Sequence, residues 1–169
     1  MNKAINIPLA VIDYEASGLI GETYPIEVGI ALTTDGITIH SASSLIRPTW
    51  EWEQYGVWNE RAEKIHNIRR RDLETAPPPE EAARAMMSLL KEHGLSTIPL
   101  HCDGGEFDEK WHAAMTKASG VKLPRLTGID QYKNINFEQY RIDHNQSQAV
   151  HRAEADARWL LQYLLDRRG

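Results

Sequence analysis

The chain is poor in cysteine, and it shows neither a long apolar run nor the pattern of a signal peptide. Cys102 is the only cysteine among 169 residues, which excludes a disulfide framework and a zinc site built from cysteines. The N-terminus shows no basic start followed by an apolar run, and no later stretch has the roughly 20 apolar residues that cross a bilayer. We therefore expect a cytoplasmic protein without a membrane span.

Acidic residues outnumber basic ones, with 24 aspartates and glutamates against 19 lysines and arginines. The net charge is −5, which argues against a protein that coats nucleic acid through nonspecific electrostatics. The only dense basic run is formed by Arg69, Arg70 and Arg71. Such a run is typical of a solvated helix face, and contact with a phosphate backbone is the alternative.

The composition and the patterning indicate one globular domain over residues 1–169. Hydrophobic residues make up 41% of the chain, and neither a repeat nor a low-complexity linker divides it. Apolar and β-rich runs predict strands at residues 5–13, 24–33, 37–46 and 98–101, with a hairpin turn at Asp35-Gly36. Helical spacing predicts helices at residues 59–65, 80–93, 106–119 and 152–165. Residues 132–147 show no clear pattern, and the whole order favours an α/β or α+β sheet covered by helices.

Acidic residues follow the first predicted strand at positions that point into the protein. Asp13 and Glu15 are two residues apart, so their side chains project from the same face of a strand. The small residues Ala16, Ser17 and Gly18 come next and would let a ligand approach the backbone. Two solvated acids at a strand end are the alternative interpretation.

Two predicted helices supply further acids. Asp108 shares a face with Trp111, and an aspartate on an apolar stripe is unusual. An acid favoured by the macrodipole near a helix start is the alternative. Asp156 lies one turn before Leu160 at the edge of a core stripe, and His151 lies five residues earlier. A helix-start aspartate and a surface histidine are the alternatives there.

Taken together, these acids predict metal binding. Buried carboxylates are costly without a positive partner, and no lysine or arginine belongs to the same faces. Several carboxylates in one site repel one another and raise one another's pKa. Two magnesium or manganese ions would relieve that repulsion and use the acids as ligands. A pair of divalent ions suggests phosphoryl chemistry.

The acidic motifs resemble those of the DEDDh branch of the DnaQ-like 3′-to-5′ exonucleases, which includes the proofreading subunit of bacterial DNA polymerase III and ribonuclease T. The family has Asp-x-Glu followed by small residues, then Phe-Asp ahead of a helix, then His and Asp separated by four residues. The corresponding segments here are Asp13-Tyr-Glu15-Ala-Ser-Gly-Leu19, Phe107-Asp108 and His151-Arg-Ala-Glu-Ala-Asp156. Their order and spacing cover nearly the whole chain.

The resemblance implies an α/β, RNase H-like fold with a mixed central sheet of about five strands flanked by α-helices. It also implies the roles of particular residues. The implied ligands of two Mg²⁺ or Mn²⁺ ions are Asp13, Glu15, Asp108 and Asp156, and the implied general base is His151. The implied neighbours of the terminal nucleotide are Ala16, Ser17, Gly18 and Leu19.

The implied activity is metal-dependent hydrolysis of single-stranded DNA or RNA from its 3′ end to nucleoside 5′-monophosphates. One ion would position the attacking water, and the other would stabilise the departing 3′ oxygen. The implied partner is therefore a single-stranded 3′ end, bound by one chain or by a homodimer. Many relatives carry His-Asn where this chain has Asp103-Gly104. That departure concerns substrate preference and removes no metal ligand.

Two alternatives accompany these predictions. A noncatalytic nucleic-acid-binding or polymerase-associated module could keep the same fold, but it would show damage at one of the five catalytic positions, and none is damaged. Trp50, Trp52 and Trp58 could stack on bases, which contributes about 1–3 kcal/mol per base in single-strand binders. Packing in the core or in loops is the commoner role of such residues.

Overall fold

The computed structural model describes residues 4–146 and 151–168, and its centre is one five-stranded sheet. The strands are β1 (Leu9–Ala16), β2 (Pro25–Thr33), β3 (His40–Leu45), β4 (Leu100–Cys102) and β5 (Leu126–Gly128). Their order in the sheet is β3-β2-β1-β4-β5. β2 is antiparallel to both β1 and β3, whereas β4 is parallel to both β1 and β5. The predicted mixed sheet is therefore confirmed.

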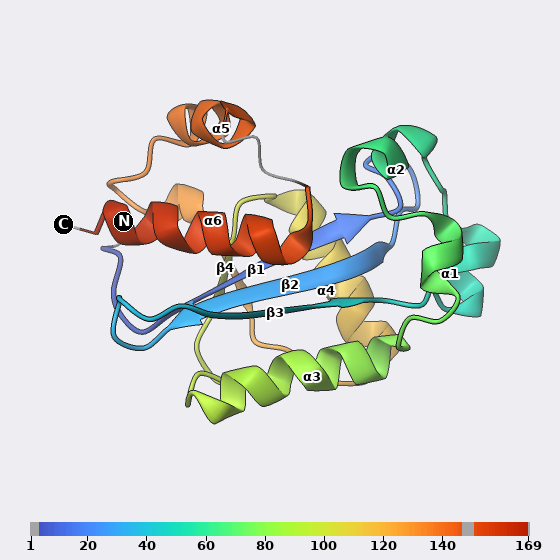
Figure 1. Cartoon of the computed structure of the whole chain (residues 1–169), viewed down its shortest axis with the longest axis horizontal. Coiled ribbons are helices and arrows are strands. Elements are labelled where there is room, and N and C mark those ends of the chain that lie inside the picture. Colours follow the sequence, from blue (N-terminus) through green and yellow to red (C-terminus); the bar gives the residue numbers. More distant parts are fainter. Residues whose placement is uncertain (1–3, 147–150, 169) are drawn as a thin grey trace.

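Helices cover both faces of this sheet (Figure 1). They are α1 (Trp50–Tyr55), α2 (Glu60–His66), α3 (Pro79–Glu92), α4 (Glu106–Ser119), α5 (Phe137–Gln146) and α6 (Ala153–Asp166), with short 3₁₀ helices at Arg70–Leu73 and Ile129–Gln131. The α3 and α4 helices pack on one face, and α6 lies across β1 and β2 on the other. Within the described residues, no helix is long and apolar enough to cross a membrane.

The alternation of side chains along β1 fixes where its acids point. Ile12 and Tyr14 belong to the apolar cluster under α3 and α4, whereas Leu9 and Val11 belong to the cluster under α6. Because side chains alternate along a strand, Asp13 and Glu15 continue the row of Leu9 and Val11. The acids therefore emerge on the α6 side, at the end of the strand where apolar packing gives way to a cleft.

Several boundaries differ from the predicted ones. β1 begins at Leu9, since Pro8 has no N–H to contribute to a strand ladder. β3 begins at His40, because Asp35 holds the preceding residues in a loop by accepting the backbone N–H groups of Ile37 and Thr38, each at 2.8 Å. The hairpin between β2 and β3 is present, but its connection is longer than a two-residue turn. The sequence pattern does not predict the α1 helix or the β5 strand.

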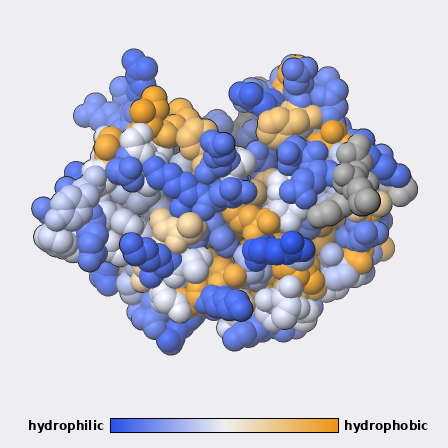
Figure 2. Space-filling model, turned by 180° about the vertical axis from the view of Figure 1, so that it is seen from behind, coloured by the Kyte–Doolittle hydropathy of each residue, from blue (hydrophilic) through white to orange (hydrophobic). Residues whose placement is uncertain are grey.

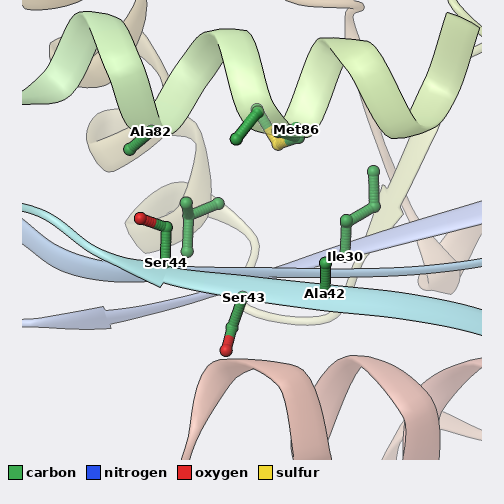
Figure 3. Close-up of a pocket in the computed structure, with 8 residues that line it drawn as sticks. Ile30, Ala42, Ser43, Ser44, Ala82 and Met86 are labelled. Atoms are coloured by element: carbon green, nitrogen blue, oxygen red, sulfur yellow. The ribbon is translucent and has the colours of Figure 1, made fainter. Parts of the chain in front are cut away.

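A small apolar gap separates α3 from the edge strand β3 (Figure 3). Its volume is about 40 Å³, and Ile30, Ala42, Ala82 and Met86 are among the residues that line it. Ser43 points away from this gap toward α6, where its hydroxyl donates to Glu154 at 3.3 Å. Among the residues that the structure describes, those lining the gap include no acidic side chain, so we interpret it as a packing defect.

Candidate active site

Three of the predicted acids meet at the end of β1. One carboxylate oxygen from each of Asp13, Glu15 and Asp156 lies within 4.8 Å of the other two. Asp156 is in the first turn of α6, which crosses the sheet beside β1 (Figure 1). Asp108, in the first turn of α4, is buried and lines the same cleft. No lysine or arginine of the described chain lines this cleft, so a cation from outside the chain would suit it.

An ion pair between the buried carboxylate of Glu27 and the partly exposed Arg152 anchors the start of α6 over β2. The Arg152 guanidinium donates to Glu27 at 2.6 Å and 2.9 Å, and the same carboxylate accepts the Ala153 N–H at 3.1 Å. Glu27 lies opposite Glu15 in the β1–β2 register. A buried charge that is paired and hydrogen-bonded is a specific constraint, so this contact sets the position of α6 and with it the position of Asp156.

Glycine at two positions lets backbone come close to the acids. Gly29 lies opposite Asp13 in the register, and a Cβ there would collide with the backbone of Ala153 at the start of α6. The Gly104 N–H donates to an Asp108 oxygen at 2.9 Å, and a Cβ on Gly104 would lie 2.7 Å from that oxygen. Neither glycine can therefore carry a side chain without moving a metal-ligand candidate.

Two histidines line the cleft that holds Asp156. The Nε2 atom of His144 is 3.3 Å from the Oδ1 atom of Asp156, and this hydrogen bond raises the pKa of His144. His151 is exposed, precedes α6 and lines the cleft, and its ring centroid is 6.3 Å from that of His144. Sequence reasoning missed His144 because it lies on α5, within the segment without a clear pattern. A Tyr140-His144 pair at helical spacing is the one signal that could have found it.

A fifth carboxylate also reaches the cleft. Asp103 follows β4, lines the cleft, and accepts a hydrogen bond from the Tyr140 hydroxyl. Its negative charge contributes to raising the pKa of both Asp13 and Asp108. In the sequence, Asp103 is noticeable only as a departure from the family pattern. Its position beside the other acids depends on the pairing of β4 with β1, which the sequence alone does not reveal.

Burial and repulsion from neighbouring carboxylates raise the pKa values of Asp13, Glu15 and Asp108. The pKa of Asp13 lies well above its usual range, mainly through burial and then through the charge of Asp108. Burial, followed by the charges of Asp156 and Glu27, raises the pKa of Glu15 to about 8. Burial and the charge of Asp103 raise the pKa of Asp108 to about 7. A bound divalent cation would favour the charged carboxylates and so oppose these shifts.

No protein-family model matches the sequence, and no curated protein matches it, but solved structures do. The nuclease domain of 3′hExo, described as a DEDDh family member bound to rAMP, superposes with a TM-score of 0.69 at 14% identity, over 94% of this chain and 90% of that one. Exonuclease X in complex with 5′ overhanging duplex DNA gives 0.58 at 19% identity, over 94% and 89%. The chain has the DnaQ-like exonuclease fold.

Other solved proteins with the DnaQ-like exonuclease fold are longer than this chain. Cell-death related nuclease 4 (CRN-4) matches with a TM-score of 0.70 at 15% identity, over 94% of this chain and 62% of its own length. A 3′-exonuclease in a complex described as recognising the 3′ end of a histone mRNA stem-loop is spanned over 64% of its length. At these identities the likeness establishes the fold, which confirms the predicted architecture, while substrate and residue roles stay predictions.

Within this DnaQ-like fold, the loop after β1 presents part of the predicted nucleotide contact. Ala16, Gly18 and Leu19 line the acidic cleft. Ser17 is turned inward instead, because its hydroxyl accepts the Tyr24 N–H at 3.0 Å. The Ser17 hydroxyl therefore stabilises the loop, and a place for Ser17 beside the terminal nucleotide stays a prediction.

Exposed apolar side chains form a rim above the acids. Leu19 is 58% exposed, Ile65 56% and Phe107 45%, and all three line the acidic cleft, whose volume is about 310 Å³. Seen from behind, the molecule is hollowed between two upper lobes, which belong to α2 and α5 (Figure 2). Apolar side chains at the edge of a cleft lined by carboxylates would suit a ligand with a flat apolar group at one end. A phosphate at its other end could approach the carboxylates through bound cations.

We expect the metal-free protein to lose stability as the pH rises. The pKa of Glu15 is about 8 in the fold against an ordinary value of 4.5, so between these values the folded state holds more protons and rising pH favours unfolding. One pKa unit corresponds to about 1.4 kcal/mol, and about 1 kcal/mol shifts the Tm of a chain this size by about 2–4 °C. Thermal melts in chelator from about pH 5 to about pH 8.5 should therefore show Tm falling by several degrees.

Saturating Mn²⁺ should remove most of that fall, because bound cations keep the carboxylates charged in the fold. Glu15→Gln should also flatten the metal-free profile, since a neutral amide does not titrate. A Tm that rose with pH across the same window would contradict the assigned carboxylate cluster.

Proposed function

We propose that this chain is a metal-dependent 3′-to-5′ exonuclease that hydrolyses single-stranded DNA or RNA to nucleoside 5′-monophosphates, with residues 1–169 as one catalytic domain. The observation that carries the proposal is the meeting of Asp13, Glu15 and Asp156 within 4.8 Å, with Asp108 in the same cleft. The complexes of fold neighbours with rAMP and with duplex DNA support a nucleic-acid substrate.

Two Mg²⁺ or Mn²⁺ ions fit this donor set, because hard divalent cations prefer carboxylate oxygens. Asp13, Glu15, Asp108 and Asp156 would hold them. Such ions supply Lewis acidity toward a phosphate and lower the pKa of a bound water. The raised pKa values of Glu15 and Asp108 mean that cation binding must release protons, so affinity should increase with pH.

His151 would accept the proton of the attacking water. It lies exposed at the mouth of the cleft, where it can approach a water above the acids. His144 is engaged with the carboxylate of Asp156 at 3.3 Å, so it would orient that ligand rather than act as the base. The two histidines therefore have separate tasks in this proposal.

The rim and the loop would hold the terminal nucleotide. Leu19, Ile65 and Phe107 offer apolar surface for the base, while the backbone at Gly18 lets the sugar approach. The scissile phosphate would then lie over the carboxylates. This arrangement suits a strand end, because a continuous duplex cannot bring an unpaired base against the rim.

A labelled strand tests this proposal directly. With Mg²⁺ or Mn²⁺, a 5′-labelled single strand should give a descending ladder and release mononucleotides one by one. Blunt duplex should be cut slowly unless its ends fray, and a 3′-phosphate should inhibit. Excess chelator is the control and should stop the reaction. Immediate release of the 5′-terminal nucleotide, or cleavage of a circular single strand at a comparable rate, would refute the assignment.

A further inference from the structure

Two aromatic side chains of α1 stand in solvent without a packing role. Trp50 is 63% exposed and Tyr55 is 72% exposed, and their rings meet edge to face with centroids 6.0 Å apart. Trp52, between them in sequence, behaves differently, since it is half-buried and stacks on Tyr24 at 5.8 Å. Packing therefore explains the position of Trp52. It does not explain why Trp50 and Tyr55 are exposed, so these two rings are candidates for binding a ligand.

A groove lies between α1 and α4 beside these rings. Tyr55 and Trp52 line one side, and Lys110 and Lys117 of α4 line the other. Its volume is about 640 Å³, which is within the roughly 300–1,000 Å³ of ligand-binding pockets. The groove thus combines flat apolar surfaces with two primary amines.

The groove and the acidic cleft are lined by residues of the same loop and the same helix. Trp111 lines the cleft, and its indole N–H donates at 3.1 Å to the hydroxyl of Thr23, which lines the groove. The next residue toward the N-terminus, Lys110, donates at 2.6 Å to the carbonyl of Gly21. Gly21 belongs to the same loop as Leu19, so one loop and one helix form a wall shared by both sites.

We propose that this groove is an upstream binding site for the same single strand, in which bases on the 5′ side of the scissile phosphate stack on Tyr55, which lines the groove, and on Trp50, which lies outside the lining but contacts the Tyr55 ring. The inference rests on the proposed exonuclease function. Exposed aromatic rings beside lysines are the usual means of holding single strands, because every base has a flat face. A duplex keeps its bases stacked and paired, so it cannot use these rings.

The charges of the groove indicate that stacking contributes more than phosphate contacts. Glu22 and Glu51 line the groove together with the two lysines, and Lys110 is 3.9 Å from the Glu22 carboxylate. With about two lysines at most to neutralise phosphates, the slope of log affinity against log salt should be shallow, between about 0 and −1.4 at about −0.7 per contact. A strand held by a basic stripe would give a much steeper slope.

Length dependence tests the groove. The double variant Trp50→Ala/Tyr55→Ala should raise KM about tenfold or more for a strand of about 12 nucleotides. It should leave KM for a dinucleotide unchanged, because in this proposal both nucleotides of a dinucleotide occupy the acidic cleft and none occupies the groove. The kcat value should not change on either substrate. Trp50→Phe/Tyr55→Phe keeps two aromatic faces and should restore most of the affinity. Ile37→Ala removes an exposed apolar side chain from the β2–β3 loop and is the matched control.

A binding measurement separates this inference from the proposed function. Fluorescence anisotropy of a labelled strand of about 12 nucleotides, recorded in chelator, should show about tenfold weaker binding to the alanine double variant. A protein that hydrolyses no strand but shows this difference would refute the exonuclease and retain the groove. Unchanged KM and unchanged anisotropy in the double variant, or equal losses on dinucleotide and long strand, would overturn the groove and leave the exonuclease standing.

Discussion

Asp13→Asn and Asp156→Asn should each reduce nuclease turnover below detection while the protein stays folded. Both side chains belong to the group of three whose oxygens lie within 4.8 Å, so either change removes a charged ligand from the centre of the cluster. The metal-free Asp13→Asn variant should also melt at a higher temperature, because burial and neighbouring carboxylates hold the pKa of Asp13 well above its usual range. The ladder assay and thermal melts check both results.

Glu154→Gln is the matched control for these variants. Glu154 lies in the same first turn of α6, but its carboxylate accepts from Ser41 at 2.7 Å and does not line the cleft. We expect this variant to keep its turnover in Mg²⁺ or Mn²⁺. Full activity in Asp13→Asn or Asp156→Asn, or full wild-type activity in excess chelator, would rule out the proposed metal site.

His151→Ala should lower turnover by about two to four powers of ten, which is the usual contribution of a general base. Metal affinity, measured by calorimetry, should change little, because His151 is exposed and lies outside the group of carboxylates that would bind the ions. The expected signature is therefore a loss in kcat without a loss in metal binding.

His144→Ala provides the comparison. Its ring contacts Asp156, so removing it should disturb the orientation of a metal ligand and alter metal affinity more than His151→Ala does. If His151→Ala abolished metal binding together with activity, His151 would be reassigned to the metal shell. If His144→Ala instead gave the larger loss in kcat at unchanged metal affinity, the two histidines would exchange roles.

The elements that could be predicted are those whose pattern is local. The α4 helix has the predicted bounds, 106–119, and α3 and α6 differ by about a residue at either end. By contrast, β5 has three residues and is defined by its pairing with β4, and α1 has six residues and no buried side chain. Segments this short carry too few positions for a period of 2 or 3.6 to be visible.

The candidate site divides in the same way. The spacing of Asp13 and Glu15 on a strand, and the place of Asp108 on a helix face, are local properties that the sequence displays. The contribution of Asp103 depends on β4 pairing beside β1, and that of His144 depends on α5 lying over α6. The periodicity of a single strand or helix cannot predict the positions of Asp103 and His144 beside the other acids, because the residues that come together are far apart in the chain.

The sequence by itself determined the inward direction of Asp13, Glu15, Asp108 and Asp156, their order along the chain and the resemblance that they carry, since strand and helix periodicity act over a few residues. Only the tertiary structure decided how those acids come within 4.8 Å of one another. That distance depends on the Glu27–Arg152 pair and on the missing side chain at Gly29, which together seat α6 on β2. Packing between distant segments, rather than any local preference, therefore turns separate carboxylates into one site.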